Sequence, residues 1–451
     1  MDPVEIDRLH GLRTVLDQAG YESKAVRDRV GDGDWLDQQV GRLRLTDSPL
    51  DVLVRLFALG EPVAIDAIEP SALEVMEPLE LVRRRDGLVE PLVAIATYGA
   101  LRLLGDVEVD EAQQAADHVR ALSFSSAICD QLTIRATVAV ALDLGCGSGV
   151  QALLAAANAD RVIAVDVNAR ACAFTRRNAV LNGCSNIEVR EGSWFEVVEG
   201  DRFDLIVANI PFVISAARRW LHRDSDIEGD GLTASIAGDL VPHLGAGGFA
   251  TMTASWFDGA PISKWVGPGA DVGVVTARSL DPLAHAVVWG GEPIGARRIH
   301  EGAFVVRRRE HDGSSMHHAA LSAPHAGRAA DHVRAMFAAS GELAALDDAA
   351  LLESSIALAE WTVVREVLQL VDGEVVITGA RIEATTGLDV GVPLDDLTLE
   401  LVRRLDGAAP FGQCLAEMAS DLELDHGLSA PMLRAVRELL AVALLARRPD
   451  A

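Results

Sequence analysis

Short apolar runs alternate with helix-like segments through the middle of this chain. The runs lie at residues 138–142, 161–166, 186–192, 203–208, 247–256, 271–278 and 302–309. Strands that alternate with helices are typical of a parallel sheet with crossover helices. We therefore predict an α/β domain over residues 119–310, with a seven-stranded, mixed and mainly parallel sheet of the Rossmann-like type.

The residues before this domain show a different pattern. Leu53 and Phe57 are four positions apart, the spacing of one helix face, and a second apolar helix follows. Asp86-Gly87 then separates two strand-like runs, which is a hairpin signal. Helix, helix and hairpin predict a small α+β module over residues 1–118, similar to a winged helix.

The residues after the α/β domain predict a linker and a third unit. Residues 311–329 are rich in Ser, Ala, Gly and His, which indicates a linker. Its adjacent His317 and His318 lack a nearby carboxylate or thiol, so we predict no metal site there. Within residues 330–451, two apolar runs flank Asp372-Gly373, and helical patterns follow at 395–405, 411–421 and 431–446. This pattern favours a second winged-helix-like or peptide-docking module.

Charge and composition narrow the classes of partner. The formal net charge is −27. It divides as −11 over residues 1–120, −4 over residues 121–340 and −12 over residues 341–451. Binding to nucleic acid depends on cationic contacts to phosphate, so a nucleic-acid partner is disfavoured. No apolar run reaches the ~18 residues of a membrane span, and five cysteines without a Cys-x-x-Cys pair predict neither disulfides nor zinc. We expect a cytoplasmic protein.

The most informative motif is Asp143-Leu-Gly145-Cys146-Gly147-Ser-Gly149. It follows an apolar strand and precedes a helix-like stretch. Alternate glycines let the backbone turn sharply and approach a ligand closely, and the next helix directs its first amides into the same space. We predict a ligand site at this turn.

Two further strand ends carry polar residues. The run at 161–166 ends in Asp166, and a carboxylate at that place accepts the hydroxyls of a ribose in dinucleotide-binding folds. The run that begins at Phe203 ends in Asn209-Ile210-Pro211-Phe212. The carboxyl ends of parallel strands meet at one edge, so these groups are expected to face the glycine turn.

Together these motifs resemble the class I S-adenosylmethionine (SAM) methyltransferases, and specifically the release-factor glutamine methyltransferase-like small-domain family with extra terminal modules. The resemblance implies SAM as cofactor and S-adenosylhomocysteine (SAH) as product. Asp143 would hold the methionine ammonium, Asp166 the ribose, and Ser193 the adenine amino group, with Trp194 or Phe195 beside the ring. The implied cofactor residues are Asp143, Gly145, Cys146, Gly147, Gly149, Asp166, Val167, Ser193, Trp194 and Asn209.

The same resemblance assigns the acceptor motif. In the family an Asn-Pro-Pro-Tyr/Phe sequence serves methyl transfer to nitrogen on planar groups. Here the catalytic residues would be Asn209, Ile210, Pro211 and Phe212, with Ile210 in place of the first proline. An Asn amide oxygen and the next carbonyl accept from an NH₂ group, and an aromatic ring stacks on a flat substrate.

The acceptor itself stays open at the level of sequence. We expect a nitrogen of a small molecule or peptide, and Arg218, Arg219, His222 and Arg223 could receive an anionic substrate. The alternatives are a protein-glutamine or nucleic-acid N-methyltransferase and a natural-product O-methyltransferase. A SAM-sensing regulator with DNA-binding modules is the non-enzymatic alternative. The sequence predicts no oligomeric state.

Overall fold

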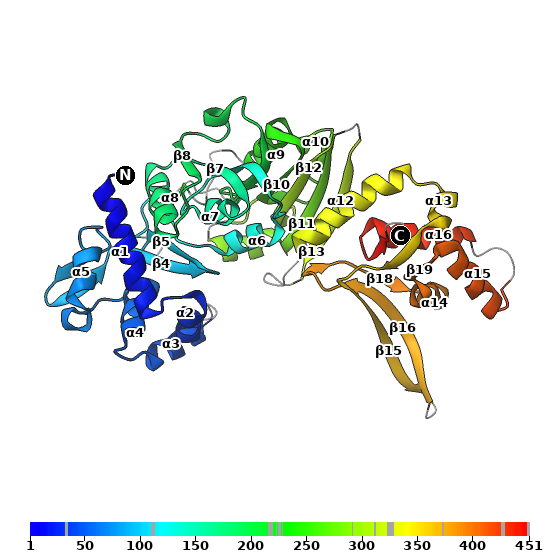
Figure 1. Ribbon diagram of the computed structural model, residues 1–451, viewed down its shortest axis with the longest axis horizontal. Coiled ribbons are helices and arrows are strands. Elements are labelled where there is room, and N and C mark those ends of the chain that lie inside the picture. Colours follow the sequence, from blue (N-terminus) through cyan, green and yellow to red (C-terminus); the bar gives the residue numbers. More distant parts are fainter. Residues whose placement is uncertain are drawn as a thin grey trace.

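The computed structural model describes residues 1–31, 35–109, 113–214, 220–221, 223, 227, 229–290, 292–310, 313–322, 329–371, 374–424 and 429–448. Figure 1 shows an elongated molecule with an N-terminal module at one end, a central α/β domain, and a C-terminal module at the other end.

One mixed sheet forms the central domain. Among the described residues it has nine strands, in the order β17-β13-β11-β12-β10-β9-β6-β7-β8. All seven strands that the sequence predicts are confirmed. They are β6 (Val138–Leu144), β7 (Ala159–Asp166), β8 (Ile187–Glu191), β9 (Phe203–Ala208), β10 (Leu244–Phe257), β11 (Ala270–Leu280) and β12 (Ile299–Arg308).

The direction of the strands fixes where a ligand can bind. β8, β7, β6, β9 and β10 are parallel neighbours, and β12 is antiparallel to both β10 and β11. The chain proceeds outward from β6 to β8 and then returns to place β9 on the other side of β6. The order therefore reverses between β6 and β9, and ligands of doubly wound sheets bind at the carboxyl ends of strands at such a point.

Two strands extend the predicted sheet. β13 (Ser315–Leu321) pairs in parallel with β11, and β17 (Leu388–Asp389) pairs with β13. The prediction of a seven-stranded sheet, with residues 311–329 as a linker, is therefore wrong for residues 315–321. The Ser, His and Ala residues of β13 show no apolar strand pattern, because few side chains of this strand are buried, Leu321 among them. The strand is held mainly by its backbone pairing with β11. His317 and His318 lie on it, and residues 311–312 and 323–328 lie outside the described residues.

Helices cover both faces of the sheet. α6 (Phe124–Leu132), α7 (Val150–Ala156) and α8 (Ala169–Leu181) pack on one face, where small side chains allow close approach. α9 (Gly231–His243) and α10 (Ile262–Val266) pack on the other, over a core of larger aliphatic and aromatic side chains. α11 (Pro282–Trp289) connects β11 to β12. Within the described residues, no helix combines the length and the apolar character that crossing a bilayer requires.

The N-terminal module is mainly helical. Its helices are α1 (Pro3–Ala19), α2 (Ser23–Val30), α3 (Trp35–Arg44), α4 (Pro49–Leu53) with a following π-turn (Val54–Ala58), and α5 (Pro70–Met76). A small sheet has the order β1-β3-β2, formed by β1 (Val63–Ala64), β2 (Val82–Arg85) and β3 (Leu88–Pro91). The hairpin predicted at Asp86-Gly87 is confirmed, whereas the winged-helix classification stays a prediction.

A second hairpin, absent from the sequence expectation, joins this module to the α/β domain. It consists of β4 (Val93–Tyr98) and β5 (Leu101–Asp106). The buried amide of Asn178 on α8 donates to the carbonyl of Leu104 and accepts from its N–H, at 3.0 and 2.7 Å. This pair of hydrogen bonds occupies the backbone N–H and carbonyl of Leu104, as a neighbouring strand would. It ties the β4–β5 hairpin to α8.

The C-terminal module mixes helices with two small sheets. Its helices are α12 (Ala329–Ala345), α13 (Asp348–Glu353), α14 (Asp396–Arg404), α15 (Phe411–Asp421) and α16 (Ser429–Ala441). Its strands are β14 (Ser355–Leu358), β15 (Thr362–Val371), β16 (Glu374–Ala384), β18 (Gly391–Leu394), β19 (Asp406–Pro410) and β20 (Leu445–Arg447). The predicted hairpin is confirmed as β15–β16, which projects from the module in Figure 1.

The C-terminal module shares its core with the central sheet. Val333 and Phe337 of α12 belong to the same buried cluster as Val275 of β11 and Val305 of β12. The module is therefore packed on the α/β domain, and β17 even pairs with a strand of the central sheet. A role as a separate docking module remains a prediction.

Candidate functional site

The carboxyl ends of β6, β7, β8 and β9 surround a cavity of about 910 Å³. Its walls include most of the residues that the sequence predicts for the site: Asp143, Gly145, Cys146, Gly147, Asp166, Val167, Ser193, Trp194, Asn209, Ile210, Pro211 and Phe212. Gly149 lies in the same loop but outside the cavity wall. The topology thus brings motifs more than sixty residues apart to one place.

Gly147 and Gly149 need glycine for different reasons. Their φ angles are 55° and 84°, in the left-handed region that favours glycine. A Cβ at Gly149 would lie 2.8 Å from Cγ2 and 3.2 Å from Cα of Thr175, so this glycine lets α7 pack against α8. A Cβ at Gly147 would meet nothing within 4 Å. Gly149 therefore serves helix packing, and Gly147 keeps its side free toward the cavity.

Asp166 is held by the glycine turn. Its Oδ2 accepts from the Gly147 amide at 2.9 Å, and its Oδ1 accepts from the Asn168 amide at 2.8 Å. Burial raises the pKa of Asp166 above its ordinary value, and the amide donors act against that rise. The next residue, Val167, is 60% exposed and lines the cavity. A fixed carboxylate beside an open apolar surface suits a ribose followed by a flat base.

Asp143 is a buried carboxylate at the base of the cavity. Its side chain is 1% exposed, and Oδ2 accepts from the Ala152 amide at 2.8 Å. Oδ1 is buried without a hydrogen-bond partner among the described residues. Burial raises the pKa of Asp143 to about 7. An orphaned carboxylate oxygen in a low-dielectric site favours a cationic ligand group, because such a group removes the cost of burying the charge.

The loop after β8 separates two neighbouring aromatic residues. Ser193 and Trp194 line the cavity, and the Trp194 ring lies 3.7 Å from the place of a Cβ on Gly145. Phe195 instead stacks on His243, with ring centroids 4.2 Å apart, and is buried in the core. Of the two aromatic candidates, Trp194 therefore faces the cavity and Phe195 packs in the core.

Asn209 is fixed at both ends of its amide. Oδ1 accepts from the hydroxyl of Thr253 on β10 at 3.0 Å, and Nδ2 donates to the hydroxyl of Ser126 on α6 at 3.3 Å. Ile210 is 2% exposed, which anchors the turn in the core, and Phe212 lines the cavity beyond it. An oxygen of known orientation next to a backbone carbonyl is suited to accept from an NH₂ group.

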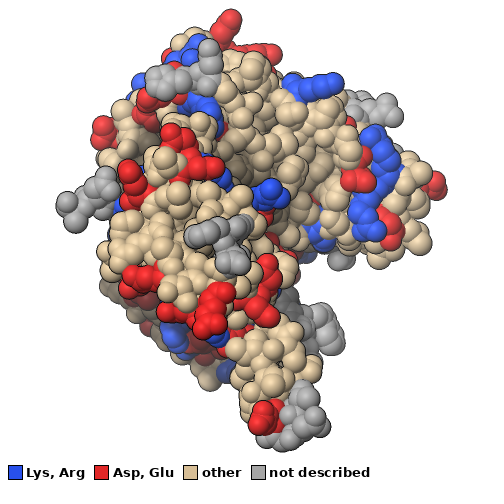
Figure 2. Space-filling model, turned by 90° about the vertical axis from the view of Figure 1, so that its right-hand side faces the viewer, with Lys and Arg blue, Asp and Glu red and all other residues tan. Residues whose placement is uncertain are grey.

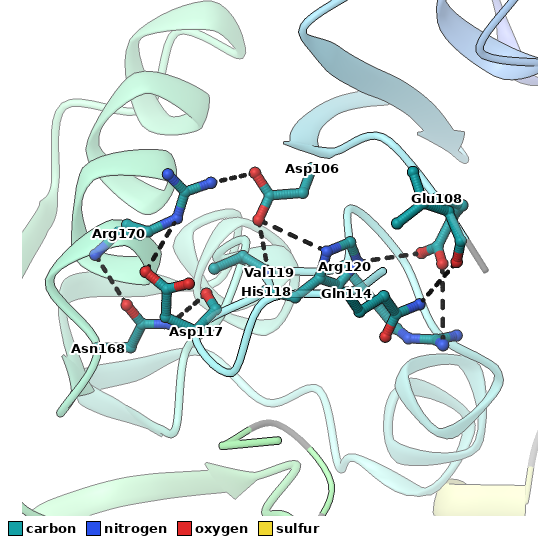
Figure 3. A network of polar contacts seen from close by, with 10 residues as sticks. Asp106, Glu108, Gln114, Asp117, His118, Val119, Arg120, Asn168 and Arg170 are labelled. Atoms are coloured by element: carbon teal, nitrogen blue, oxygen red, sulfur yellow. Dashed lines mark hydrogen bonds and ion pairs between the residues drawn. The ribbon is translucent and has the colours of Figure 1, made fainter. Parts of the chain in front are cut away.

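The segment after β5 contributes residues 118–120 to the cavity wall, and polar contacts tie it to β5 and α8 (Figure 3). Asp106 accepts from the Val119 amide at 2.8 Å and pairs with Arg170 on α8. The carbonyl of Asp117 accepts from Nδ2 of Asn168 at 2.9 Å. Because the backbone amide of Asn168 also donates to Asp166, this network fastens the segment to the loop between β7 and α8.

Within that segment, His118 lies between two carboxylates. It is 4% exposed and lines the cavity, with Nδ1 and Nε2 each 3.8 Å from an oxygen of Asp106 and Glu108, respectively. No residue of this segment was among the predicted site residues. The only signal was its position, between a hairpin and the first helix of the α/β domain.

Three residues at the far end of the cavity were missed as well: Arg278, Trp289 and Glu301. They come from β11, α11 and β12, beyond the motifs, and no motif marks them. The available signal was a tryptophan at the end of a short helix whose other residues are apolar except for His285. The cation cluster predicted near the motif is described only at Arg223, which lines the cavity. Arg218, Arg219 and His222 lie outside the described residues.

The described part of the chain contains no candidate metal-binding cluster. No group of three or more His, Cys, Asp or Glu side chains there could hold a metal ion. The described cysteines are all free thiols.

Comparison with known proteins identifies the domain. Residues 125–222 match the family model of the methyltransferase small domain. This segment is similar to the methyltransferase small domain. It begins at α6 and includes the glycine turn, Asp166 and the Asn209 motif, and it belongs to a class I fold with SAM as cofactor.

Curated relatives of this domain are release factor glutamine methyltransferases. That of Xylella fastidiosa (strain Temecula1) is 34% identical over 151 residues, which cover 31% of this chain and 55% of the relative. That of Escherichia coli K12 is 31% identical over 137 residues, covering 27% and 49%. The chain thus spans about half the length of these relatives.

Solved structures give only distant likenesses. A ribosomal protein L11 methylase from Lactobacillus delbrueckii subsp. bulgaricus has a TM-score of 0.27 at 18% identity, over 42% of this chain and 78% of that one. A methyltransferase from Pyrococcus furiosus has a TM-score of 0.28 at 17% identity, over 46% and 89%. The strand order described above is what establishes the fold.

The residues of the cavity fit SAM. The buried Oδ1 of Asp143 suits the cationic methionine ammonium, and the Asp166 carboxylate suits two ribose hydroxyls. The exposed face of Val167 and the ring of Trp194 suit a flat adenine. A Cβ at Gly147 would enter the same space. The predicted cofactor residues, Gly149 excepted, thus form one continuous wall.

Proposed function

We propose that the protein is a SAM-dependent methyltransferase that transfers the methyl group to a nitrogen of a flat group on a small molecule or peptide. The observation that carries the proposal is the doubly held amide of Asn209, which faces the cofactor cavity with its oxygen oriented by Thr253. Bound SAM supplies an electrophilic methyl on a sulfonium.

The chain's own contribution is orientation. Asn209 Oδ1 and the carbonyl of Ile210 accept from the acceptor NH₂, and they direct its nitrogen lone pair away from the protein and toward the cofactor. Phe212 contacts the flat side of the acceptor. Neither role needs a strong base, because positioning supplies most of the rate. Pro211 fixes the turn between these residues.

A peptide carboxamide belongs among the acceptors. The relatives are named for methylating glutamine in release factors, and a glutamine amide is a flat NH₂-bearing group. The Ile210 substitution keeps the backbone carbonyl that such an amide would use.

The surface charge disfavours a nucleic-acid acceptor and the DNA-binding regulator. The net charge is −27, and Figure 2 shows acidic side chains gathered above the projecting hairpin on the C-terminal side. Phosphate contacts dominate nucleic-acid affinity. An electrophoretic shift assay with duplex DNA at moderate salt should show no binding, and binding there would favour the regulator.

Mass spectrometry tests the proposed function. The protein is incubated with methyl-deuterated SAM and either a peptide mixture or a metabolite extract, and labelled products are fragmented to locate the methyl. We expect label on nitrogen. Asn209→Ala should cut turnover by orders of magnitude while SAM affinity stays within a few-fold, since it removes positioning rather than cofactor contacts. Methyl on oxygen, or an Asn209→Ala variant with wild-type activity, would overturn nitrogen transfer.

A further inference from the structure

Two aromatic rings meet at a right angle at the acceptor end of the cavity. Phe212 follows the Asn209 motif, and Trp289 is the last residue of α11. Their ring centroids are 6.4 Å apart and their planes make an angle of 90°. Both side chains line the cavity. They form an L-shaped wall, which we call the aromatic corner.

An ion pair between the buried Glu301 and the partly exposed Arg278 sets the position of Trp289. Its indole N–H donates to Oε1 of Glu301, which is 4% exposed. The other oxygen, Oε2, accepts from Nε of Arg278 at 2.8 Å and also from Nη2. The Arg278 guanidinium lies over the Trp289 ring, 5.5 Å from its centroid. The Glu301 carboxylate therefore fixes the indole in two ways. It accepts from the N–H at the ring edge, and it holds the Arg278 guanidinium over the ring face.

Two further groups contact Glu301 or Trp289. His285 Nε2 lies 3.7 Å from Oε1, and burial lowers the pKa of His285, so the imidazole is neutral at pH 7. Arg223 donates to the backbone carbonyl of Trp289 at 3.1 Å. A buried carboxylate is costly unless it is paired and hydrogen-bonded. Glu301 meets that condition through Arg278 and Trp289. As a result, the indole ring of Trp289 is held in one orientation.

We propose that Trp289 is a specificity-determining residue, which with Phe212 admits a flat nitrogen-bearing group such as a carboxamide or an aromatic amine and excludes saturated amines. Glu301 and Arg278 are positioning residues that hold the indole. This inference rests on the proposed function, because it takes the Asn209 end of the cavity as the acceptor site. A right-angled corner gives a flat group one face to stack on and one edge to abut, whereas a saturated ring fits neither.

Indole N–H resonances report the corner directly. The full-length protein is labelled with ¹⁵N-tryptophan and saturated with SAH, and Trp289→Phe assigns the resonance. Benzamide and adenine are the flat probes, and cyclohexylamine is the saturated one. We expect both flat probes to shift the Trp289 signal and cyclohexylamine to leave it unmoved. Trp265 on α10, outside the cavity wall, is assigned by Trp265→Phe and should not move. No shift with the flat probes, or an equal shift with cyclohexylamine, overturns the proposal.

Glu301→Gln tests the positioning role. It should move the Trp289 resonance in the protein without probe and weaken benzamide binding about tenfold, the loss of roughly one charge-assisted hydrogen bond. SAH affinity should be unchanged. Glu310→Gln, at an exposed carboxylate two residues after the end of β12, is the control and should change neither reading. If Glu301→Gln unfolds the protein, the probe shifts in the wild type still decide the proposal.

The outcomes separate the corner from the proposed function. If flat probes shift Trp289 but the labelled product carries methyl on oxygen, the corner stands and nitrogen transfer fails. If a nitrogen product forms and Trp289→Ala keeps the wild-type kcat/KM for it, the corner fails and nitrogen transfer stands.

Discussion

The hydroxyl of Thr253 donates a hydrogen bond of 3.0 Å to the side-chain oxygen of Asn209. Thr253 lies on β10 and is 1% exposed, so water does not compete for this bond. The bond decides which end of the amide is the oxygen. It therefore links a buried strand residue, which belongs to no motif, to the group that we propose receives the acceptor.

Removing that hydroxyl should slow methyl transfer without harming the cofactor site. In Thr253→Val the shape is kept, but Asn209 loses a buried partner, which is worth about 1–3 kcal/mol. We expect kcat to fall by about tenfold or more, at 1.4 kcal/mol per factor of ten. SAM affinity from calorimetry should stay within a few-fold. Thr253→Ser restores the hydroxyl and should restore the rate, and a Val variant as active as wild type would remove Thr253 from the site.

The Gly147–Asp166 bond makes a second prediction, on cofactor affinity. Asp166→Ala removes the carboxylate proposed for the ribose and should weaken SAM binding by about 2–3 kcal/mol, as measured by calorimetric titration. Gly147→Val should act similarly because its side chain enters the cavity. Asp160→Ala, an exposed carboxylate on the same strand, is the matched control. Unchanged affinity in Asp166→Ala would exclude Asp166 from the cofactor site.

Asp143 predicts a pH dependence of stability in the protein without ligand. Its pKa rises from 3.8 to about 7 on folding, so the folded state holds the proton more tightly than the unfolded state. Stability from this group is therefore greatest below about pH 4 and is lost as the pH rises to about 7. Asp143→Asn keeps an acceptor for Ala152 and removes the ionisation.

Urea unfolding at several pH values measures this effect. The stability advantage of Asp143→Asn over the wild type should grow between about pH 4 and 7 and level off above, at an order of magnitude of about 4 kcal/mol from 1.36 kcal/mol per pKa unit. A difference that is constant with pH would show that Asp143 has an ordinary pKa.

Much of the fold was predictable because the strands and helices of an α/β domain have characteristic patterns of apolar residues that are visible in the sequence. The buried runs at β6 and β9 and the hairpins β2–β3 and β15–β16 depend on local chemistry; Asp372 and Gly373 themselves lie outside the described residues. β13 and the β4–β5 hairpin do not depend on local chemistry. Their pairing partners lie on β11 and α8, and a strand stabilised from outside needs no strong pattern of its own.

The site divides in the same way. Asp143, Asp166 and Asn209 sit at strand ends, so topology alone brings them together. Trp194 and Phe195 are neighbours of equal apolar character, and only the positive φ of Trp194, 42°, sends one to the cavity and the other to the core. Glu301 and Trp289 meet through a hydrogen bond between side chains of β12 and α11, and no local pattern encodes it.

The shared core predicts the outcome of truncation. Deleting residues 330–451 removes α12 and exposes Val275 and Val305 on the sheet. We expect the shortened protein to be insoluble or loosely folded, with SAM binding lost as a consequence, measured by soluble yield and near-ultraviolet circular dichroism.

Shortening the exposed hairpin is the control for that truncation. Replacing residues 368–377 by a two-residue turn leaves the core untouched and should change neither solubility nor SAM affinity. A well-folded 1–329 protein that binds SAM normally would show that the C-terminal module is a separate unit.

The pairing of Leu321 on β13 with Leu388 on β17 also orders events during synthesis. The strands from β6 to β13 leave the ribosome before β17, so one edge of the central sheet is still open at that stage. An open edge is a template for pairing with other chains, and domains generally fold as units from the N-terminus. The nascent chain must therefore extend about a further 70 residues before the edge is covered. In this protein the catalytic sheet reaches its final form only late in translation, when the downstream segment that finishes it has emerged.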